Sequence, residues 1–259
     1  MRTLQWWLAV VLGSAIVAAG LLIWGIRRRV DRRTIQRRFW APVYDRLARL
    51  YDAVDWFTGN MTHRLRRRAL RYLPPAGGRV LEIGFGSGKL HTEMARRYRM
   101  AGVELAPGMA QLTRRRLAAH GLHSALAVGS VYALPWPGGS FDAVVSTFAF
   151  SAFPDAEGAL DEMVRVTRPG GQVIIVDAGE ASDGNWGAHV LAKAWTALGD
   201  YVRDEVPLME ERGLHVEREE YGPWGCVHVV AGTRPVTSCT AGPGRGRVFR
   251  AERHLKRNG

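Results

Sequence analysis

The middle of the chain repeats one unit, a short apolar segment followed by a helical pattern. The apolar segments span residues 79–84, 100–105, 124–129, 141–147 and 172–178. They are apolar throughout instead of at alternate positions, which predicts strands buried on both faces of a parallel sheet. Helices are expected from the end of the first segment to about Arg99, over 107–120 and over 155–167. This alternation excludes an all-helical or all-β fold for the region.

Two further segments, 215–222 and 225–232, have the pattern of a hairpin that closes the sheet. The fold class predicted is therefore α/β, a Rossmann-like, mostly parallel seven-stranded sheet with helices on both faces. Additional helical patterns cover 39–58, 61–73 and a stretch around 186–212. The domain organisation expected is an N-terminal transmembrane anchor (1–26), a basic juxtamembrane and helical cap (27–73), the α/β core (74–233) and a disordered basic tail (234–259).

The anchor is predicted from 21 consecutive uncharged residues, Trp6 to Ile26. A helix of that length spans roughly 30 Å, the thickness of the hydrocarbon layer. A buried helix of a water-soluble domain would show a polar face, and a cleaved signal peptide would carry its positive charge before the apolar run. Here only Arg2 precedes the run, and a cluster of arginines that begins at Arg27 follows it. The positive-inside rule then predicts a single-pass membrane protein in which everything after Arg27 is cytoplasmic.

The net charge of +12 is unevenly distributed. Residues 27–71 hold 14 Arg against four acidic residues, and 234–259 are also basic, whereas 72–233 hold 14 basic and 19 acidic residues. A basic collar beside a span predicts an anionic lipid surface as partner. Nucleic acid is not expected, because no helix-turn-helix, zinc or aromatic RNP pattern accompanies the arginines. The two cysteines, Cys226 and Cys239, form no C-x-x-C pair, so neither a metal site nor a disulfide scaffold is predicted.

A glycine-rich turn follows the first strand of the core, with Gly84, Gly86 and Gly88 behind the acidic Glu82. Such a turn lets a ligand approach the backbone, although a tight strand-to-helix corner would also need glycine. The E-x-G-x-G-x-G order differs from the dinucleotide fingerprint, and the carboxylate suits a cationic amino-acid ligand. Glu104 ends the next strand, where a carboxylate accepts hydrogen bonds from ribose hydroxyls unless it only faces solvent.

Four segments carry a family resemblance: LEIGFGSGKL (81–90), VELAPGM (103–109), ALPWPGGSFDAVVST (133–147) and RVTRPGGQVIIVD (165–177). Residues 40–233 resemble a class I S-adenosylmethionine-dependent methyltransferase. The resemblance implies that the three glycines pack against the methionine and ribose of S-adenosyl-L-methionine, that Glu82 helps to hold this portion, and that Glu104 binds the ribose diol. It places Met109 near the adenine, where helix packing is the alternative. Many relatives have an acidic residue after the third strand; here Ser130, Val131 or their backbone groups would contact the adenine.

The N-terminal segment 44–70 most resembles quinone C-methyltransferases of ubiquinone and menaquinone synthesis, and bacterial phospholipid N-methyltransferases look similar. The loop after the fourth strand contains Phe148, Phe150 and Phe153, and Trp186 and Trp195 follow. These aromatics predict either an apolar pocket for a lipophilic acceptor or core packing.

The expected function is membrane-anchored methyl transfer to a quinone-type ring or a phospholipid headgroup. The alternatives are a methyltransferase for small thiols or metabolites and an inactive membrane-tethered scaffold. A general base, where the acceptor needs one, has four candidates by position alone, Tyr51, Asp52, Asp177 and His189.

Overall fold

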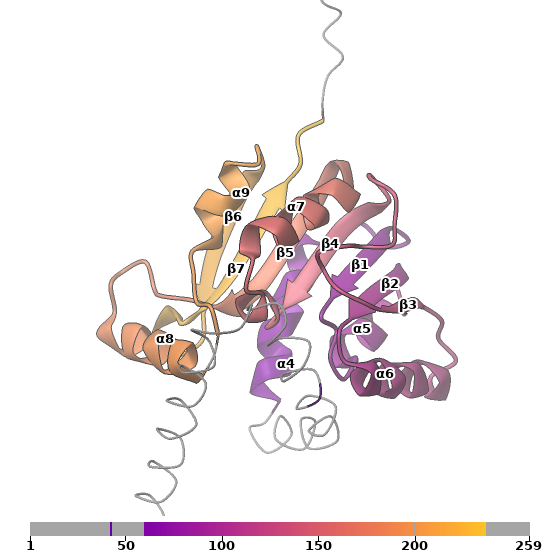
Figure 1. Ribbon diagram of the computed structural model, residues 1–259, viewed down its shortest axis with the longest axis horizontal. Helices are drawn as coiled ribbons and strands as arrows, with labels where there is room; N and C mark the ends of the chain where they lie inside the picture. The colour runs from indigo at the N-terminus through magenta and orange to yellow at the C-terminus, as the bar shows by residue number, and fades with distance from the viewer. Residues whose placement is uncertain (1–41, 43–59, 199, 237–259) are drawn as a thin grey trace, which may run out of the picture.

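The computed structural model describes residue 42, residues 60–198 and residues 200–236. Its centre is a seven-stranded sheet of order β3-β2-β1-β4-β5-β7-β6 (Figure 1). Strands β1 to β5 are parallel, and β7 runs antiparallel to both β5 and β6. The strand bounds are β1 (Arg79–Ile83), β2 (Arg99–Glu104), β3 (Ala125–Val128), β4 (Phe141–Thr147), β5 (Thr167–Ala178), β6 (His215–Tyr221) and β7 (Val227–Thr233). The predicted fold class is confirmed for this part of the chain.

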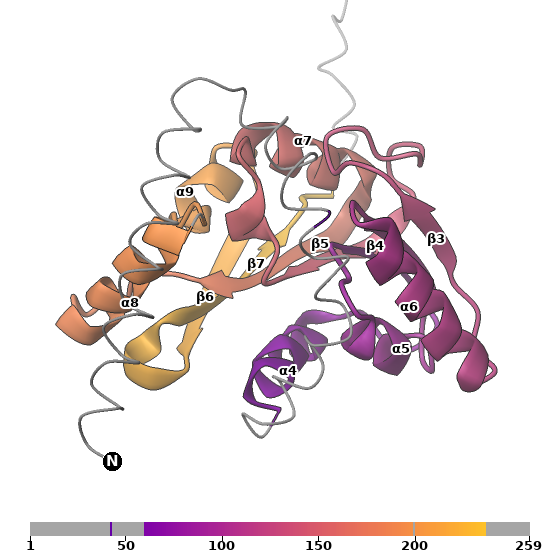
Figure 2. The same cartoon turned by 60° about the horizontal axis from the view of Figure 1, so that its bottom comes forward.

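Helices cover both faces of the sheet, with α7 and α9 on one side and α4 and α5 on the other (Figure 2). Alternate strand residues supply the two cores, Leu81 and Val144 facing α7, and Val80 and Val145 facing α5. The bounds are α4 (Met61–Arg66), η2 (Arg67–Tyr72), α5 (Lys89–Met94), α6 (Pro107–Ala119), η3 (Phe150–Ala152), α7 (Ala156–Val166), α8 (Trp186–Leu198), α9 (Glu205–Glu210) and η4 (Pro223–Gly225). Burial of apolar residues on both faces explains why the strands lack alternation.

Several predicted boundaries were wrong. Helix α5 ends at Met94 instead of Arg99, because the Arg97 and Tyr98 amides turn back to the Met94 carbonyl and Arg99 already pairs with β1. The helical stretch around 186–212 is two helices, α8 and α9. Strand β5 begins at Thr167, five residues early, because Thr167 pairs with Phe141 before a register shift. The 61–73 helix tightens into the 3₁₀ helix η2 after Arg66.

No helix within the described ranges is long and apolar enough to cross a membrane. The predicted anchor, the helix predicted over 39–58 and most of the predicted tail lie outside those ranges. The described part of the basic collar, on α4 and η2, is attached to the core. Arg67 pairs with Glu93 at 2.8 Å, Arg71 pairs with Glu219 at 3.0 Å, and the Arg68 guanidinium lies 4.4 Å from the centre of the Tyr221 ring.

Candidate active site

The glycine turn lies where β1 ends, between β2 and β4, at the point where the strand order reverses. Open α/β sheets bind ligands at the carboxyl ends of the strands at such a point. Gly84, Gly86 and Gly88 have φ angles of +67°, +54° and +75°, which favour glycine. A Cβ on Gly88 would overlap the Thr113 side chain, whereas a Cβ on Gly86 would have no heavy atom of the described chain within 4 Å. The described residues therefore leave the space beside Gly86 open.

Glu104 fastens this turn from the end of β2. Its Oε2 accepts the Gly86 amide at 2.9 Å and its Oε1 accepts the Ala106 amide at 3.0 Å. Burial raises the pKa of Glu104 above its ordinary value, and the two N–H groups oppose this rise. Each carboxylate oxygen accepts more than one hydrogen bond, so Glu104 retains acceptor capacity for a ligand hydroxyl. The ribose role of Glu104 stays a prediction.

Glu82 is fully buried behind the same turn. Its Oε2 lies 2.9 Å from His91 Nδ1, whereas its Oε1 has no hydrogen-bond partner among the described residues. Because a buried carboxylate oxygen without a donor is costly, this atom fits a ligand that brings a donor. The structure thus brings the three glycines, Glu82 and Glu104 together around the end of β1.

The residues predicted near an adenine are placed at the end of β3 and on α6. Met109 is buried on α6 and packs beside Ala106, so the helix-packing alternative holds for at least part of its surface. Val131 is buried in the core beneath α7. Ser130 is half-buried, and its hydroxyl oxygen accepts the Tyr132 amide at 3.3 Å.

The aromatic loop after β4 divides between core and surface. Phe150 and Phe153 belong to the core, with ring centres 5.8 Å apart, so the core-packing alternative holds for these two side chains. Phe148 is half-buried and has a φ of +50°, an uncommon conformation for a bulky residue. Its ring lies 5.4 Å from the Arg66 guanidinium, which also donates to the Thr147 carbonyl at 3.1 Å. Phe148 is therefore the aromatic held at the strand end.

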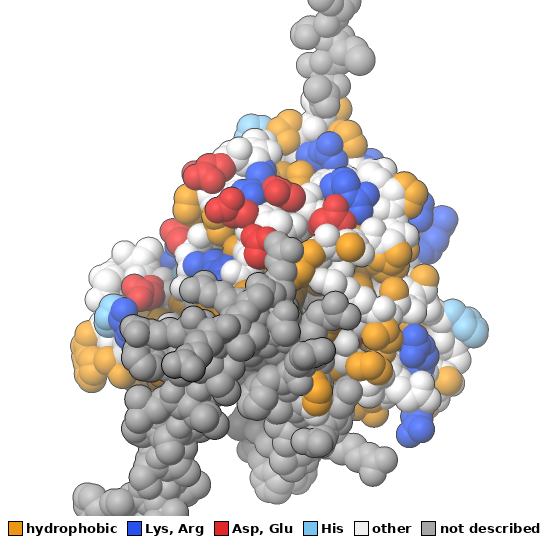
Figure 3. Space-filling model, viewed as in Figure 1, with side chains coloured by type: hydrophobic (Ala, Val, Ile, Leu, Met, Phe, Trp, Pro, Cys, Tyr) orange, Lys and Arg blue, Asp and Glu red, His pale blue; other side chains and the backbone are white. Residues whose placement is uncertain are grey.

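Hydrophobic side chains are exposed on α8 (Figure 3), and they belong to Trp186 and Val190. A small cavity is lined by Trp186 and His189 together with Glu180 and Asn185. His189 is exposed and its Nδ1 lies 3.3 Å from Glu180 Oε1, an arrangement that solvent screens. Of the other predicted bases, Tyr51 and Asp52 lie outside the described residues.

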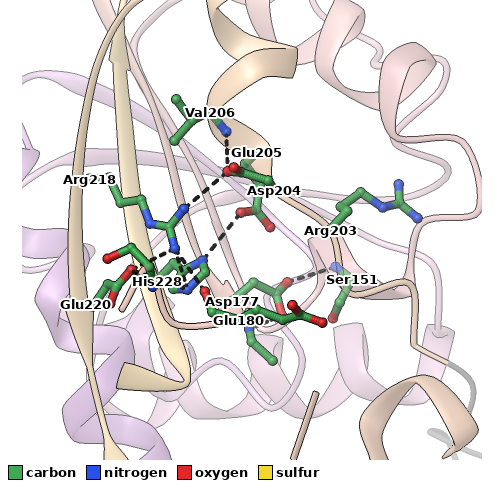
Figure 4. A network of polar contacts seen from close by, with 12 residues as sticks. Ser151, Asp177, Glu180, Arg203, Asp204, Glu205, Val206, Arg218, Glu220 and His228 are labelled. Atoms are coloured by element: carbon green, nitrogen blue, oxygen red, sulfur yellow. Dashed lines mark hydrogen bonds and ion pairs between the residues drawn. The ribbon is translucent and has the colours of Figure 1, made fainter. Parts of the chain in front are cut away.

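Asp177 lies at the end of β5 within a buried polar network (Figure 4). Its Oδ2 accepts the Ser151 amide and its Oδ1 the Ala178 amide, both at 2.8 Å, so the carboxylate holds the β4–α7 loop. Burial raises the pKa of Asp177, against the effect of these donors. Glu205, at the start of α9, is also buried, and burial raises its pKa with a further contribution from the Asp177 charge.

His228 connects this network to β6. Its Nε2 lies 2.9 Å from Arg218 Nη2, which is always a donor, so Nε2 accepts and the ring proton is on Nδ1. That proton faces Glu205 Oε2 at 3.9 Å, too long for a hydrogen bond. Arg218 also donates to Glu220 at 2.7 Å. These contacts join α9, β6 and β7 across the face of the sheet.

Three residues of the site were missed from the sequence, His91, Ser124 and Thr113. Thr113 donates to the Gly86 carbonyl at 3.0 Å, and His91 Nε2 lies 2.8 Å from Ser124 Oγ. Only the glycine turn signalled that the helix after it would face the site. The position of Ser124, 33 residues beyond His91, follows from strand pairing alone.

The core is similar to known methyltransferases. Residues 81–175 match the family model described as "Methyltransferase domain". Demethylmenaquinone methyltransferase of Thermus thermophilus is 37% identical over 53% of this chain and 61% of its own length. Malonyl-[acyl-carrier protein] O-methyltransferase of Halorhodospira halophila is 36% identical over 69% of this chain and 58% of its own length. Phosphatidylethanolamine N-methyltransferase of Cereibacter sphaeroides is 33% identical over 48% of this chain and 62% of its own length. The chain thus spans about three-fifths of the length of these relatives.

Solved structures agree on the fold. A SAM-dependent methyltransferase of Thermotoga maritima, described as a possible histamine N-methyltransferase, superposes with a TM-score of 0.60 at 21% identity. The superposition covers 74% of this chain and 98% of that one. At this identity the likeness establishes the architecture and leaves the reaction to the site residues.

Proposed function

We propose that this chain is an S-adenosylmethionine-dependent methyltransferase that transfers a methyl group to a lipophilic acceptor, a quinone-type ring or a phospholipid headgroup, at a membrane surface. The observation that carries this proposal is the similarity to demethylmenaquinone and phosphatidylethanolamine methyltransferases. The activity is proposed for the domain, since the matches span only part of each relative.

The residues around the glycine turn fit this cofactor. The open space beside Gly86 admits a ligand against the backbone, and Glu104 retains acceptor capacity at the strand end. Glu82 Oε1, buried without a partner in the described chain, is an acceptor for an ammonium group. We infer that the glycines contact the methionine and ribose portion, that Glu104 accepts from the ribose diol and that Glu82 faces the methionine end. Ser130, Val131 and Met109 remain proposed adenine contacts.

When bound, the cofactor supplies a methyl group already activated by a sulfonium. The protein residues therefore contribute mainly alignment and exclusion of water. Thr113 and Glu104 hold the turn rigid from its two sides. Asp177 holds the β4–α7 loop, and Phe148 presents an aromatic ring at the end of β4. Tyr51, Asp52 and His189 remain candidate bases for an acceptor that loses a proton.

We further propose that residues 6–26 anchor the chain and that the domain faces the cytoplasm. Washing membranes that contain the full chain separates two modes of attachment. An anchored protein resists both high salt and carbonate, whereas attachment through the basic collar alone is released by salt. Protease added to sealed vesicles of known orientation reports the side of the domain. Release of the protein by high salt would contradict the anchor. Protection of the domain from protease that is added on the cytoplasmic side would contradict the topology.

The acceptor is tested by incubating membranes that carry the full chain with methyl-labelled S-adenosylmethionine. Labelled methyl groups in the organic extract that alkali does not release as methanol indicate a C-methylated ring or an N-methylated headgroup, and mass spectrometry of the intact extract separates the two. A second candidate follows from the malonyl-carrier relative, whose match covers the most of this chain among the three. An O-methyl ester would release labelled methanol in alkali. Membranes with a Gly86→Asp variant are the control, and label confined to protein or RNA would refute the lipophilic acceptor.

A further inference from the structure

A buried row of polar side chains lies directly behind the glycine turn. Glu82 and His91 are fully buried, and Ser124 is half-buried next to them. Glu82 Oε2 lies 2.9 Å from His91 Nδ1, His91 Nε2 lies 2.8 Å from Ser124 Oγ, and Ser124 Oγ donates to the Met100 carbonyl at 3.0 Å. The row joins β1, α5 and the start of β3, and nothing in the mechanism above uses His91 or Ser124.

The donors in this row are determined by Ser124. Its single hydroxyl proton goes to the Met100 carbonyl, so Ser124 Oγ accepts from His91 and Nε2 carries a proton. One proton then lies between His91 Nδ1 and Glu82 Oε2, bonded either to the imidazole or to the carboxyl group. In both arrangements the Glu82–His91 pair has no net charge. A lone buried carboxylate would lack this compensation.

The strand opposite Glu82 leaves room for the imidazole. Gly102 of β2 pairs with Glu82, and a Cβ at that position would lie 3.0 Å from His91 Cε1 and 2.6 Å from Phe85 Cδ1. The Phe85 and His91 rings are 5.3 Å apart between centres. The imidazole is therefore held between the sheet and an aromatic ring, with little rotational freedom. Its hold on Glu82 Oε2 leaves Oε1 as the only oxygen of that carboxyl group without a described partner.

We propose that His91 is a positioning residue for the cofactor site: by binding Glu82 Oε2 it directs Glu82 Oε1 toward the ammonium group of the cofactor's methionine. This inference rests on the proposed function and adds a residue to it. His91 acts through Glu82 and does not touch the cofactor. Ser124 orients His91 from the opposite ring nitrogen.

A pair of amide variants separates the two contacts of His91. Asparagine places its amide nitrogen near the position of Nδ1 and keeps a donor for Glu82, whereas glutamine reaches the position of Nε2 and keeps the contact to Ser124. The affinity for S-adenosylhomocysteine is measured by calorimetry on the full chain. His91→Asn is expected to stay within roughly threefold of the wild type, whereas His91→Gln and His91→Leu lose roughly 10- to 100-fold. Equal losses for the two amide variants would overturn the proposal.

A double-mutant cycle shows whether His91 acts through Glu82. Glu82→Gln is expected to lose a similar factor, and adding His91→Leu to it is expected to cost no more than roughly threefold further. A purely structural role for His91 would instead multiply the two losses. Thr92→Val is the matched control on the same helix, because Thr92 Oγ1 is buried without a partner in the described chain. It is expected to leave the affinity unchanged.

Thermal unfolding of each variant shows which of them remain folded. If His91→Leu does not fold, the affinities of His91→Asn and His91→Gln, each measured with and without Glu82→Gln, still show whether His91 acts through Glu82. A wild-type protein that binds neither S-adenosylmethionine nor S-adenosylhomocysteine would refute the proposed function together with this inference. Wild-type binding combined with multiplied losses would refute the role of His91 alone.

Discussion

Replacing Gly86 and Gly88 separately by alanine tests the assignment of the glycine turn. Both residues have a positive φ, so alanine incurs a similar backbone strain at each position. Their surroundings differ. A Cβ on Gly88 would overlap the Thr113 side chain, whereas a Cβ on Gly86 enters open space in the described structure. The two substitutions should therefore affect different properties of the protein.

The left-handed conformation destabilises a folded protein with alanine at this position by roughly 1–2 kcal/mol. Alanine also lowers the conformational entropy of the unfolded chain, which stabilises the folded state by about 0.4–1 kcal/mol. Gly86→Ala should thus lower the free energy of unfolding by only about 1 kcal/mol. Gly88→Ala adds overpacking of about 1–3 kcal/mol against Thr113, for a total of about 2–4 kcal/mol. The methyl group of Gly86→Ala, by contrast, occupies space that we assign to the cofactor and should weaken the binding of S-adenosylhomocysteine. A steric cost of about 1.4 kcal/mol or more in binding free energy corresponds to a loss of affinity of about tenfold or more.

Urea unfolding measures the first effect and calorimetry with S-adenosylhomocysteine the second. Binding by Gly88→Ala is measured at a temperature where the variant is fully folded. Unaltered affinity in Gly86→Ala would show that the cofactor does not lie against this part of the turn. A larger loss of stability in Gly86→Ala than in Gly88→Ala would refute the steric reasoning.

Three further predictions concern charge and strain. Burial raises the pKa of Glu104, so the affinity for the cofactor should increase as the pH rises through a range above 4.5 and the carboxyl group ionises. Calorimetry at several pH values should show this increase in the wild type and not in Glu104→Gln. The same increase in the variant would contradict the role of Glu104. Burial also raises the pKa of Glu205, so the folded state retains a proton that the unfolded chain releases, and stability should decline as the pH rises above the ordinary carboxyl range. Glu205→Gln should reduce that decline in urea unfolding at pH 4 and pH 8, and an identical decline would refute the assignment. Phe148→Gly should relieve backbone strain of about 1–3 kcal/mol, but it also removes the packing of the half-buried ring against the core and Arg66, so urea unfolding should show no net gain in stability. Acceptor turnover, measured by label transfer, should fall, and full turnover would exclude Phe148 from the acceptor site.

Aromatic residues show where reasoning from the sequence stops. The three phenylalanines after β4 look equivalent in the sequence, yet Phe150 and Phe153 are in the core and Phe148 is at the strand end. The difference arises from the Asp177 carboxylate, which holds Ser151 and thereby turns the loop over the sheet. Asp177 is 26 residues further along the chain, so no local pattern contains this information.

The sequence by itself determined the alternating strands and helices, the glycine turn and the acidic residues near the ends of β1 and β2. These features follow from periodicity and from the backbone freedom of glycine, which are local properties. Only the tertiary structure decided that Glu82 meets His91, that His91 meets Ser124, and that Glu205 and His228 lie beside Asp177. Hydrogen bonding and protonation of a buried group depend on every element packed around it, and strand order, which brings these elements together, is a property of the whole sheet.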